Sequence, residues 1–189
     1  MRCLNCANLS FFTFCKECKK RLSIKSPSKR VVDDLNVYSF YSYDEVKHLI
    51  HSKHHLHGLF VYRALANLSF KEFAKEFKFG EQILALPIDD DITTGYSHTA
   101  ILARSLKNKE IKPKYGILRA SSKVKYSGKS LEFRQKHKRG FKILEQIDCP
   151  VILVDDIITT GTTLAEANKA CKEAGVRVLF ALTLADARE

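Results

Sequence analysis

The stretch of sequence that decides the fold is VILVDDIITTGTT, which spans residues 151–163. Its first four residues are apolar and mostly β-branched, which is typical of a strand buried on both faces of a parallel sheet. Two adjacent carboxylates, Asp155 and Asp156, follow at the carboxyl end of this strand, where open α/β sheets place their ligands. A turn rich in threonine leads from there into a helix. The stretch therefore predicts one strand–turn–helix unit of an α/β domain.

The rest of the chain continues this alternation of strands and helices. We expect strands at 37–41, 83–86, 115–118 and 176–184, and helices from residue 44 and over 59–77, 98–107 and 163–174. Strands that alternate with helices predict a mostly parallel sheet flanked by helices. Residues 119–142 are rich in Lys, Ser and Gly, fit neither pattern, and are expected to form a long loop.

The turn after the two carboxylates suits a phosphate monoester. It consists of Thr159, Thr160, Gly161, Thr162 and Thr163. Such a turn presents backbone N–H groups, hydroxyl donors and the positive end of a helix dipole. The carboxylates would repel a phosphate, so they suit sugar hydroxyls or a magnesium ion held with the substrate. These residues favour a phosphorylated sugar as the ligand; the alternative is a surface strand followed by an ordinary capped helix.

Four of the six cysteines form two Cys-x-x-Cys pairs separated by eight residues near the N-terminus. They are Cys3, Cys6, Cys15 and Cys18. Each pair can donate two sulfurs, and four thiolates hold zinc tetrahedrally, so we expect a zinc site that stabilises a segment too short for its own core. Three phenylalanines, at 11, 12 and 14, lie between the pairs, and lysines follow. These aromatic residues could stack on a single-stranded nucleic acid or pack against the main domain.

The formal net charge of +11 is concentrated in two segments. Residues 1–30 hold eight Lys/Arg and one acid, and residues 104–142 hold fourteen Lys/Arg and two acids. Segregated positive charge favours polyanionic partners. The candidate contacts to DNA or pyrophosphate in the second segment are Lys123, Lys125, Lys129, Arg134, Lys136, Lys138 and Arg139. A solvated loop without a partner is the alternative for this segment.

Residues 151–163 resemble the phosphoribosyl-pyrophosphate-binding signature of type I phosphoribosyltransferases. Joined to the N-terminal cysteine pairs, the chain resembles the ComF family, in which a small zinc module precedes a phosphoribosyltransferase-like domain. Residues 85–88 and 95–100 are similar to the family's strand, pyrophosphate loop and following helix, and residues 127–141 to its flexible basic loop. The resemblance implies a four-cysteine zinc module with a basic linker at 1–30 and a phosphoribosyltransferase-like α/β domain at 31–189.

The same resemblance implies a ligand and a process. Asp155 and Asp156 would bind the ribose hydroxyls of phosphoribosyl pyrophosphate, residues 159–163 would surround its 5′-phosphate, and magnesium would accompany it. Members of the family are linked to natural transformation, which implies single-stranded DNA and other DNA-uptake proteins as partners.

Two departures from the related patterns restrict this interpretation. Asp89, Asp90, Asp91 and Thr94 stand where the family carries basic residues, so pyrophosphate contact there would need an intervening magnesium ion. The alternative is an exposed acidic turn that points away from the ligand. Thr159 stands where purine-salvage relatives carry an aspartate base, which disfavours purine salvage.

Three functions stay open on the sequence. The first is a ComF-like protein that binds magnesium and phosphoribosyl pyrophosphate and contacts single-stranded DNA. The second is an active phosphoribosyltransferase whose acceptor the sequence does not identify. The third is a non-enzymatic DNA-binding adaptor of the uptake machinery. Since no apolar run approaches about 20 residues and the first residues have no signal-peptide pattern, we expect a cytoplasmic protein that partners could bring to the inner face of the membrane.

Overall fold

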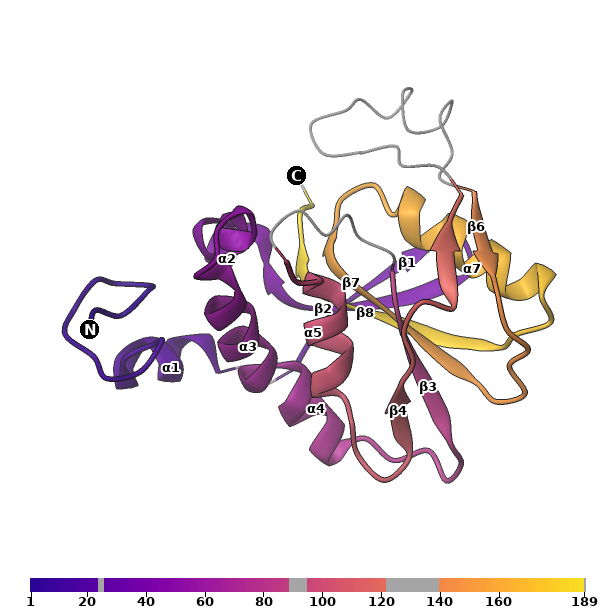
Figure 1. Ribbon diagram of the computed structural model, residues 1–189, viewed down its shortest axis with the longest axis horizontal. Helices are drawn as coiled ribbons and strands as arrows, with labels where there is room; N and C mark the ends of the chain where they lie inside the picture. The colour runs from indigo at the N-terminus through magenta and orange to yellow at the C-terminus, as the bar shows by residue number, and fades with distance from the viewer. Residues whose placement is uncertain (24–25, 89–94, 122–139, 189) are drawn as a thin grey trace.

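The computed structural model of the protein describes residues 1–23, 26–88, 95–121 and 140–188. Its centre is a six-stranded sheet in the order β1-β2-β8-β7-β3-β4, parallel throughout except for the antiparallel pair β1 and β2 (Figure 1). The strands are β1 (Ser28–Val32), β2 (Leu35–Ser42), β3 (Ile83–Pro87), β4 (Ile111–Pro113), β7 (Val151–Ile158) and β8 (Val178–Asp186). The prediction of an α/β fold with a mostly parallel sheet is confirmed.

Helices cover both faces of this sheet. They are α1 (Lys16–Leu22), α2 (Tyr43–Ile50), the 3-10 helix η1 (His51–His54), α3 (Gly58–Leu68), α4 (Phe70–Glu76), α5 (His98–Ser105) and α7 (Thr162–Glu173). Helices α2 to α5 pack on one face, while α7 and an antiparallel pair, β5 (Leu118–Ala120) with β6 (Phe141–Ile143), pack on the other. Strand β7 is buried on both faces, since Ile152 and Val154 enter the first core and Val151 and Leu153 the second.

Two predicted elements differ from the structure. The helix expected over 59–77 is divided at Ser69, whose φ of −124° leaves the helical range and whose hydroxyl donates to the Leu65 carbonyl at 2.7 Å. Serine competes with the helix for such backbone groups, which explains the break. The strand expected over 115–118 is wrong, because Gly116 has a φ of +73° and β5 begins only at Leu118.

Strand boundaries differ from the prediction elsewhere too. Strand β4 was not predicted, and it pairs with β3 at the edge of the sheet. Strand β1 begins at Ser28, inside the segment expected to be a linker. Strands β5 and β6 occupy the two ends of the segment expected to be a loop, and residues 122–139 between them lie outside the described residues.

The N-terminal cysteine segment is joined to the main core. Phe14, Cys18 and Leu22 are buried in the same cluster as residues of α2 and α3. The Tyr41 hydroxyl donates to the Leu22 carbonyl at 2.7 Å. Phe14 therefore packs inward, as one of the two sequence alternatives proposed, whereas Phe11 and Phe12 do not. No helix among the described residues has the length and hydrophobicity needed to span a bilayer.

Candidate functional site

The sheet order reverses between β3 and β7. The connection from β3 through α5 leads to β4 at one edge, whereas the connection from β7 through α7 leads to β8 on the other side. Open α/β sheets bind ligands outside the carboxyl ends of the strands at such a point. Pro87 pairs with Val154, and β7 then continues to Ile158 beyond this last contact with β3. The strand end that extends past β3 carries Asp155 and Asp156.

The two carboxylates have different surroundings. Successive side chains of a strand point to opposite faces of the sheet, so Asp156 shares the face of α2 to α5 and Asp155 the face of α7. Asp155 is 8% exposed, and its Oδ1 accepts the backbone N–H of Asp156 at 2.8 Å. The Asp156 side chain is 15% exposed. The sequence predicted that both carboxylates follow the strand, whereas β7 continues through them to Ile158.

Asp156 has two partners that the sequence did not suggest. The Lys53 ammonium of η1 lies 2.9 Å from its Oδ2, and the Tyr62 hydroxyl of α3 donates to the same oxygen at 3.3 Å. Burial, and next the charge of Asp156, raise the pKa of Tyr62 well above its usual value, so the phenol remains a donor. No local pattern links these residues, because Lys53 and Asp156 are 103 positions apart.

The threonine-rich turn follows directly from β7. Thr159 and Thr160 are exposed, and Gly161 is the N-cap of α7 with a φ of +84°. A Cβ atom at Gly161 would lie 2.7 Å from both γ-carbons of Val32, so the chain also passes close to β1 here. The Thr160 and Thr162 hydroxyls are 2.9 Å apart. The turn thus presents exposed hydroxyls at the start of a helix, as the sequence predicted, and such a start attracts anions.

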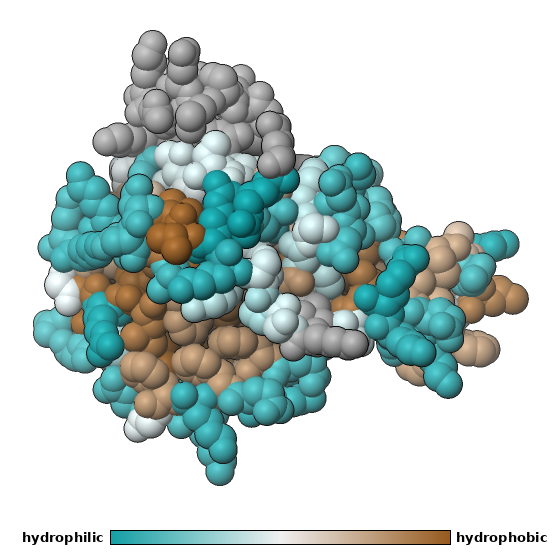
Figure 2. All heavy atoms as spheres, turned by 180° about the vertical axis from the view of Figure 1, so that it is seen from behind, coloured by the Kyte–Doolittle hydropathy of each residue, from teal (hydrophilic) through white to brown (hydrophobic). Residues whose placement is uncertain are grey.

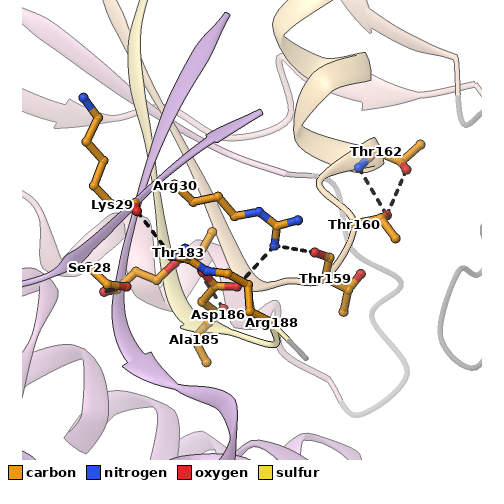
Figure 3. A network of polar contacts seen from close by, with 11 residues as sticks. Ser28, Lys29, Arg30, Thr159, Thr160, Thr162, Thr183, Ala185, Asp186 and Arg188 are labelled. Atoms are coloured by element: carbon orange, nitrogen blue, oxygen red, sulfur yellow. Dashed lines mark hydrogen bonds and ion pairs between the residues drawn. The ribbon is translucent and has the colours of Figure 1, made fainter. Parts of the chain in front are cut away.

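An arginine of β1 holds this turn to the end of β8 (Figure 3). The Arg30 guanidinium donates to the Thr159 carbonyl at 2.6 Å and to Asp186 Oδ1 at 3.2 Å. Arg188 donates to Asp186 Oδ2 at 2.5 Å and to the Lys29 carbonyl at 3.2 Å. The side chain of Asp186 is only 6% exposed, so two arginines compensate a nearly buried charge.

Sequence reasoning missed both Arg30 and Asp186. Asp186 follows a predicted strand at its carboxyl end, the same signal that singled out Asp155, and could have been found in that way. Arg30 carries no such signal, because the Ser, Pro and Lys content of residues 23–30 predicts a linker.

The four N-terminal cysteines come together as the sequence predicted. The sulfurs of Cys3, Cys6, Cys15 and Cys18 lie within 4.8 Å of one another. Burial raises the pKa of Cys3, but the backbone N–H groups of Cys15, Cys6 and Asn5 outweigh it and bring the pKa to about 6. The Asn5 amide lowers the pKa of Cys18, but burial and the neighbouring thiols raise it to about 12. The raised pKa of Cys18 favours its neutral thiol, whereas a divalent metal such as zinc would hold it as a thiolate.

Two polar contacts of Asn5 link this cluster to α2. The Asn5 amide lies 3.1 Å from Cys18 Sγ, and its carbonyl oxygen lies 2.7 Å from His48 Nε2. Metal ligands are commonly oriented by partners of this kind. The cluster is therefore anchored to the domain by a histidine as well as by the buried Phe14.

The remaining predicted residues lie outside the described part of the chain. These are Asp89, Asp90, Asp91 and Thr94, and the basic residues Lys123, Lys125, Lys129, Arg134, Lys136, Lys138 and Arg139. The described structure thus brings the carboxylates and the threonine turn together at the carboxyl ends of the parallel strands. The four cysteines form a separate cluster. No family model matches the chain, and no curated protein sequence matches it.

Proposed function

We propose that this chain is a ComF-like protein that binds magnesium and phosphoribosyl pyrophosphate at the carboxyl end of β7. One observation carries the proposal: a buried carboxylate, its partly buried neighbour and a threonine turn lie close together where the sheet order reverses. Carboxylates accept hydrogen bonds from sugar hydroxyls, and a helix start with hydroxyl donors binds phosphate. A sugar phosphate needs both kinds of group close together.

Each group has a separate part in this proposal. Asp155 and Asp156 accept the ribose hydroxyls, while the backbone and hydroxyls of residues 159–163 bind the 5′-phosphate. Magnesium, when bound with the ligand, neutralises pyrophosphate charge and is held by carboxylate oxygens. Arg30 fixes the position of the turn through the Thr159 carbonyl.

The proposal includes contact with single-stranded DNA during cytoplasmic handling of incoming DNA. The module at residues 1–23 projects from the domain in Figures 1 and 2, and its surface carries both apolar and polar residues. Phe11 is 95% and Phe12 65% exposed, and the Lys19 ammonium lies 4.2 Å from the Phe12 ring centroid. Exposed aromatic rings beside cations are suited to single strands. The same observation favours the second candidate, a DNA-binding adaptor that needs no sugar phosphate.

Titration calorimetry with magnesium and phosphoribosyl pyrophosphate tests the proposal. We expect saturable binding that Asp155→Asn and Asp156→Asn each abolish. Asp148→Asn is the matched control, since Asp148 is exposed before the amino end of β7. Unchanged binding in both variants would exclude this site.

Two further measurements separate the alternatives. Binding of a labelled oligothymidine that survives Asp155→Asn, in a protein that binds no sugar phosphate, supports the adaptor. Release of pyrophosphate with any member of a panel of nucleobases and amines supports an active phosphoribosyltransferase, in which the carboxylates would stabilise positive charge developing at the anomeric carbon.

A further inference from the structure

We infer that Lys53 is an additional ligand-binding residue of this site: its ammonium, which pairs with Asp156, moves to the pyrophosphate when the sugar phosphate binds. The inference rests on the proposed function and adds a residue that the threonine turn and the two carboxylates do not include. It starts from the ion pair between Lys53 Nζ and Asp156 Oδ2, 2.9 Å apart.

The backbone of Lys53 is held in place by two side chains of the segment that follows β3. Its carbonyl oxygen accepts the Tyr96 hydroxyl at 3.3 Å and lies 3.2 Å from His98 Nε2. Gly58 packs tightly against the backbone of Ser52 and the side chain of Tyr96. A Cβ atom at Gly58 would lie 2.4 Å from the Tyr96 hydroxyl and 2.2 Å from the Ser52 carbonyl oxygen. Lys53 is therefore held by the segment that follows β3, and its aliphatic stem starts from a fixed point.

The ammonium group of Lys53 is less constrained than its backbone. Its side chain is 25% exposed, and lysine carries its charge on four rotatable methylene groups. An ammonium on such a stem can change partners without any movement of the backbone. Asp156 meanwhile keeps the Tyr62 hydroxyl as a second donor at 3.3 Å, so the carboxylate stays in position when the ammonium leaves.

The direction of the movement follows from the two ends of the ligand. The threonine turn belongs to the β7–α7 connection, whereas Lys53 is anchored through Tyr96 and His98 on the side of β3 and α5. When the 5′-phosphate occupies the turn and the ribose hydroxyls reach Asp156, the pyrophosphate at the other end of the ribose lies toward Lys53. The ribose hydroxyls then replace the ammonium on Asp156, and the pyrophosphate offers the ammonium a stronger negative charge.

Two ligands distinguish this role from that of a fixed counterion. Phosphoribosyl pyrophosphate and ribose 5-phosphate share the 5′-phosphate and the ribose, but only the first carries pyrophosphate. Calorimetry of the full chain with magnesium should show that Lys53→Met weakens phosphoribosyl pyrophosphate by about 10- to 100-fold, the factor expected for one charged hydrogen bond. Ribose 5-phosphate should bind this variant as tightly as the wild type, or more tightly.

Two variants complete the experiment. Lys53→Arg should recover most of the lost affinity, because it restores the charge. Lys47→Met is the control. Lys47 is exposed on α2, and its ammonium pairs with the Asp44 carboxylate at 3.2 Å instead of contacting the site. Circular dichroism and thermal unfolding of each variant report whether it is folded.

Three results would overturn the inference. Equal losses for both ligands in a folded Lys53→Met protein would show that the lysine only supports Asp156. No loss for either ligand would show that it has no part in binding. A wild-type protein that binds neither ligand would contradict the proposed function itself, and this inference with it.

Discussion

Arg30 of β1 donates a hydrogen bond of 2.6 Å to the backbone carbonyl of Thr159, a residue 129 positions further along the chain. The same guanidinium contacts Asp186 at the end of β8. The antiparallel strand at the edge of the sheet thereby reaches the turn that we propose as the phosphate site (Figure 3). The relationship makes β1 part of the support of the site, although its sequence resembles a linker.

Removal of this support should weaken both the protein and its ligand binding. We expect Arg30→Ala to lower the free energy of unfolding in urea by about 1–3 kcal/mol, because Asp186 keeps only Arg188 and loses one charged hydrogen bond. Binding of phosphoribosyl pyrophosphate should fall as the Thr159 carbonyl is released. Lys29→Ala on the same strand is the control, because only the Lys29 carbonyl takes part in the network. Equal effects of the two substitutions would contradict the role of Arg30.

Gly161 should not tolerate a side chain. Its φ of +84° costs an alanine about 1–2 kcal/mol, and its Cβ atom would lie 2.7 Å from the side chain of Val32. We therefore expect Gly161→Ala to destabilise the protein by more than the backbone term alone. Val32→Ala in the same chain should remove the steric part of this loss, leaving the backbone part. Additive losses in the double variant, measured by urea unfolding, would show that the two residues do not meet.

The cysteine cluster should bind one zinc ion per chain. The cysteine thiols must lose their protons to bind the metal, so the zinc affinity should fall as the pH decreases. Because Phe14, Cys18 and Leu22 belong to the main core, chelation should lower the melting temperature of the whole protein. Metal analysis checks the stoichiometry, with Cys15→Ser expected to lose the ion and Cys149→Ser to keep it. A melting temperature unaffected by chelation would contradict this coupling.

Cys171 should make the stability of the protein depend on alkaline pH. Burial raises its pKa from 9.0 to about 11, so the folded state favours the neutral thiol. This contribution is present in full below about pH 9 and is lost as the pH rises through 11. Its upper limit is about 3 kcal/mol, since one pKa unit corresponds to about 1.4 kcal/mol.

Urea unfolding of the wild type and of Cys171→Ala from about pH 8 to 11 isolates this contribution, because the other titrating groups are common to both proteins. The stability difference between the two should shrink or reverse as the pH rises. A difference that stays constant over this range would show that Cys171 does not titrate as proposed.

Much of the fold follows from short patterns in the sequence. The apolar run at residues 151–154 predicts β7. Alternate residues of this run pack into the two hydrophobic cores on opposite faces of the sheet. The same stretch places Asp155, Asp156 and the threonine turn close together, because only Ile157 and Ile158 separate them along the chain. The two Cys-x-x-Cys pairs likewise predict a four-sulfur cluster, since each pair brings two sulfurs together locally. These features need no information from distant parts of the chain.

The tertiary structure alone decided what surrounds these groups. Lys53, Tyr62 and Arg30 reach the site from η1, α3 and β1, and no local pattern relates them to the residues that follow β7. Their approach depends on the order of the strands and on the faces that the helices cover, which are set by packing of the whole core. The sequence by itself determined which chemical groups stand at the end of β7 and in the turn after it. Only the folded chain determined which distant charges neutralise and position them.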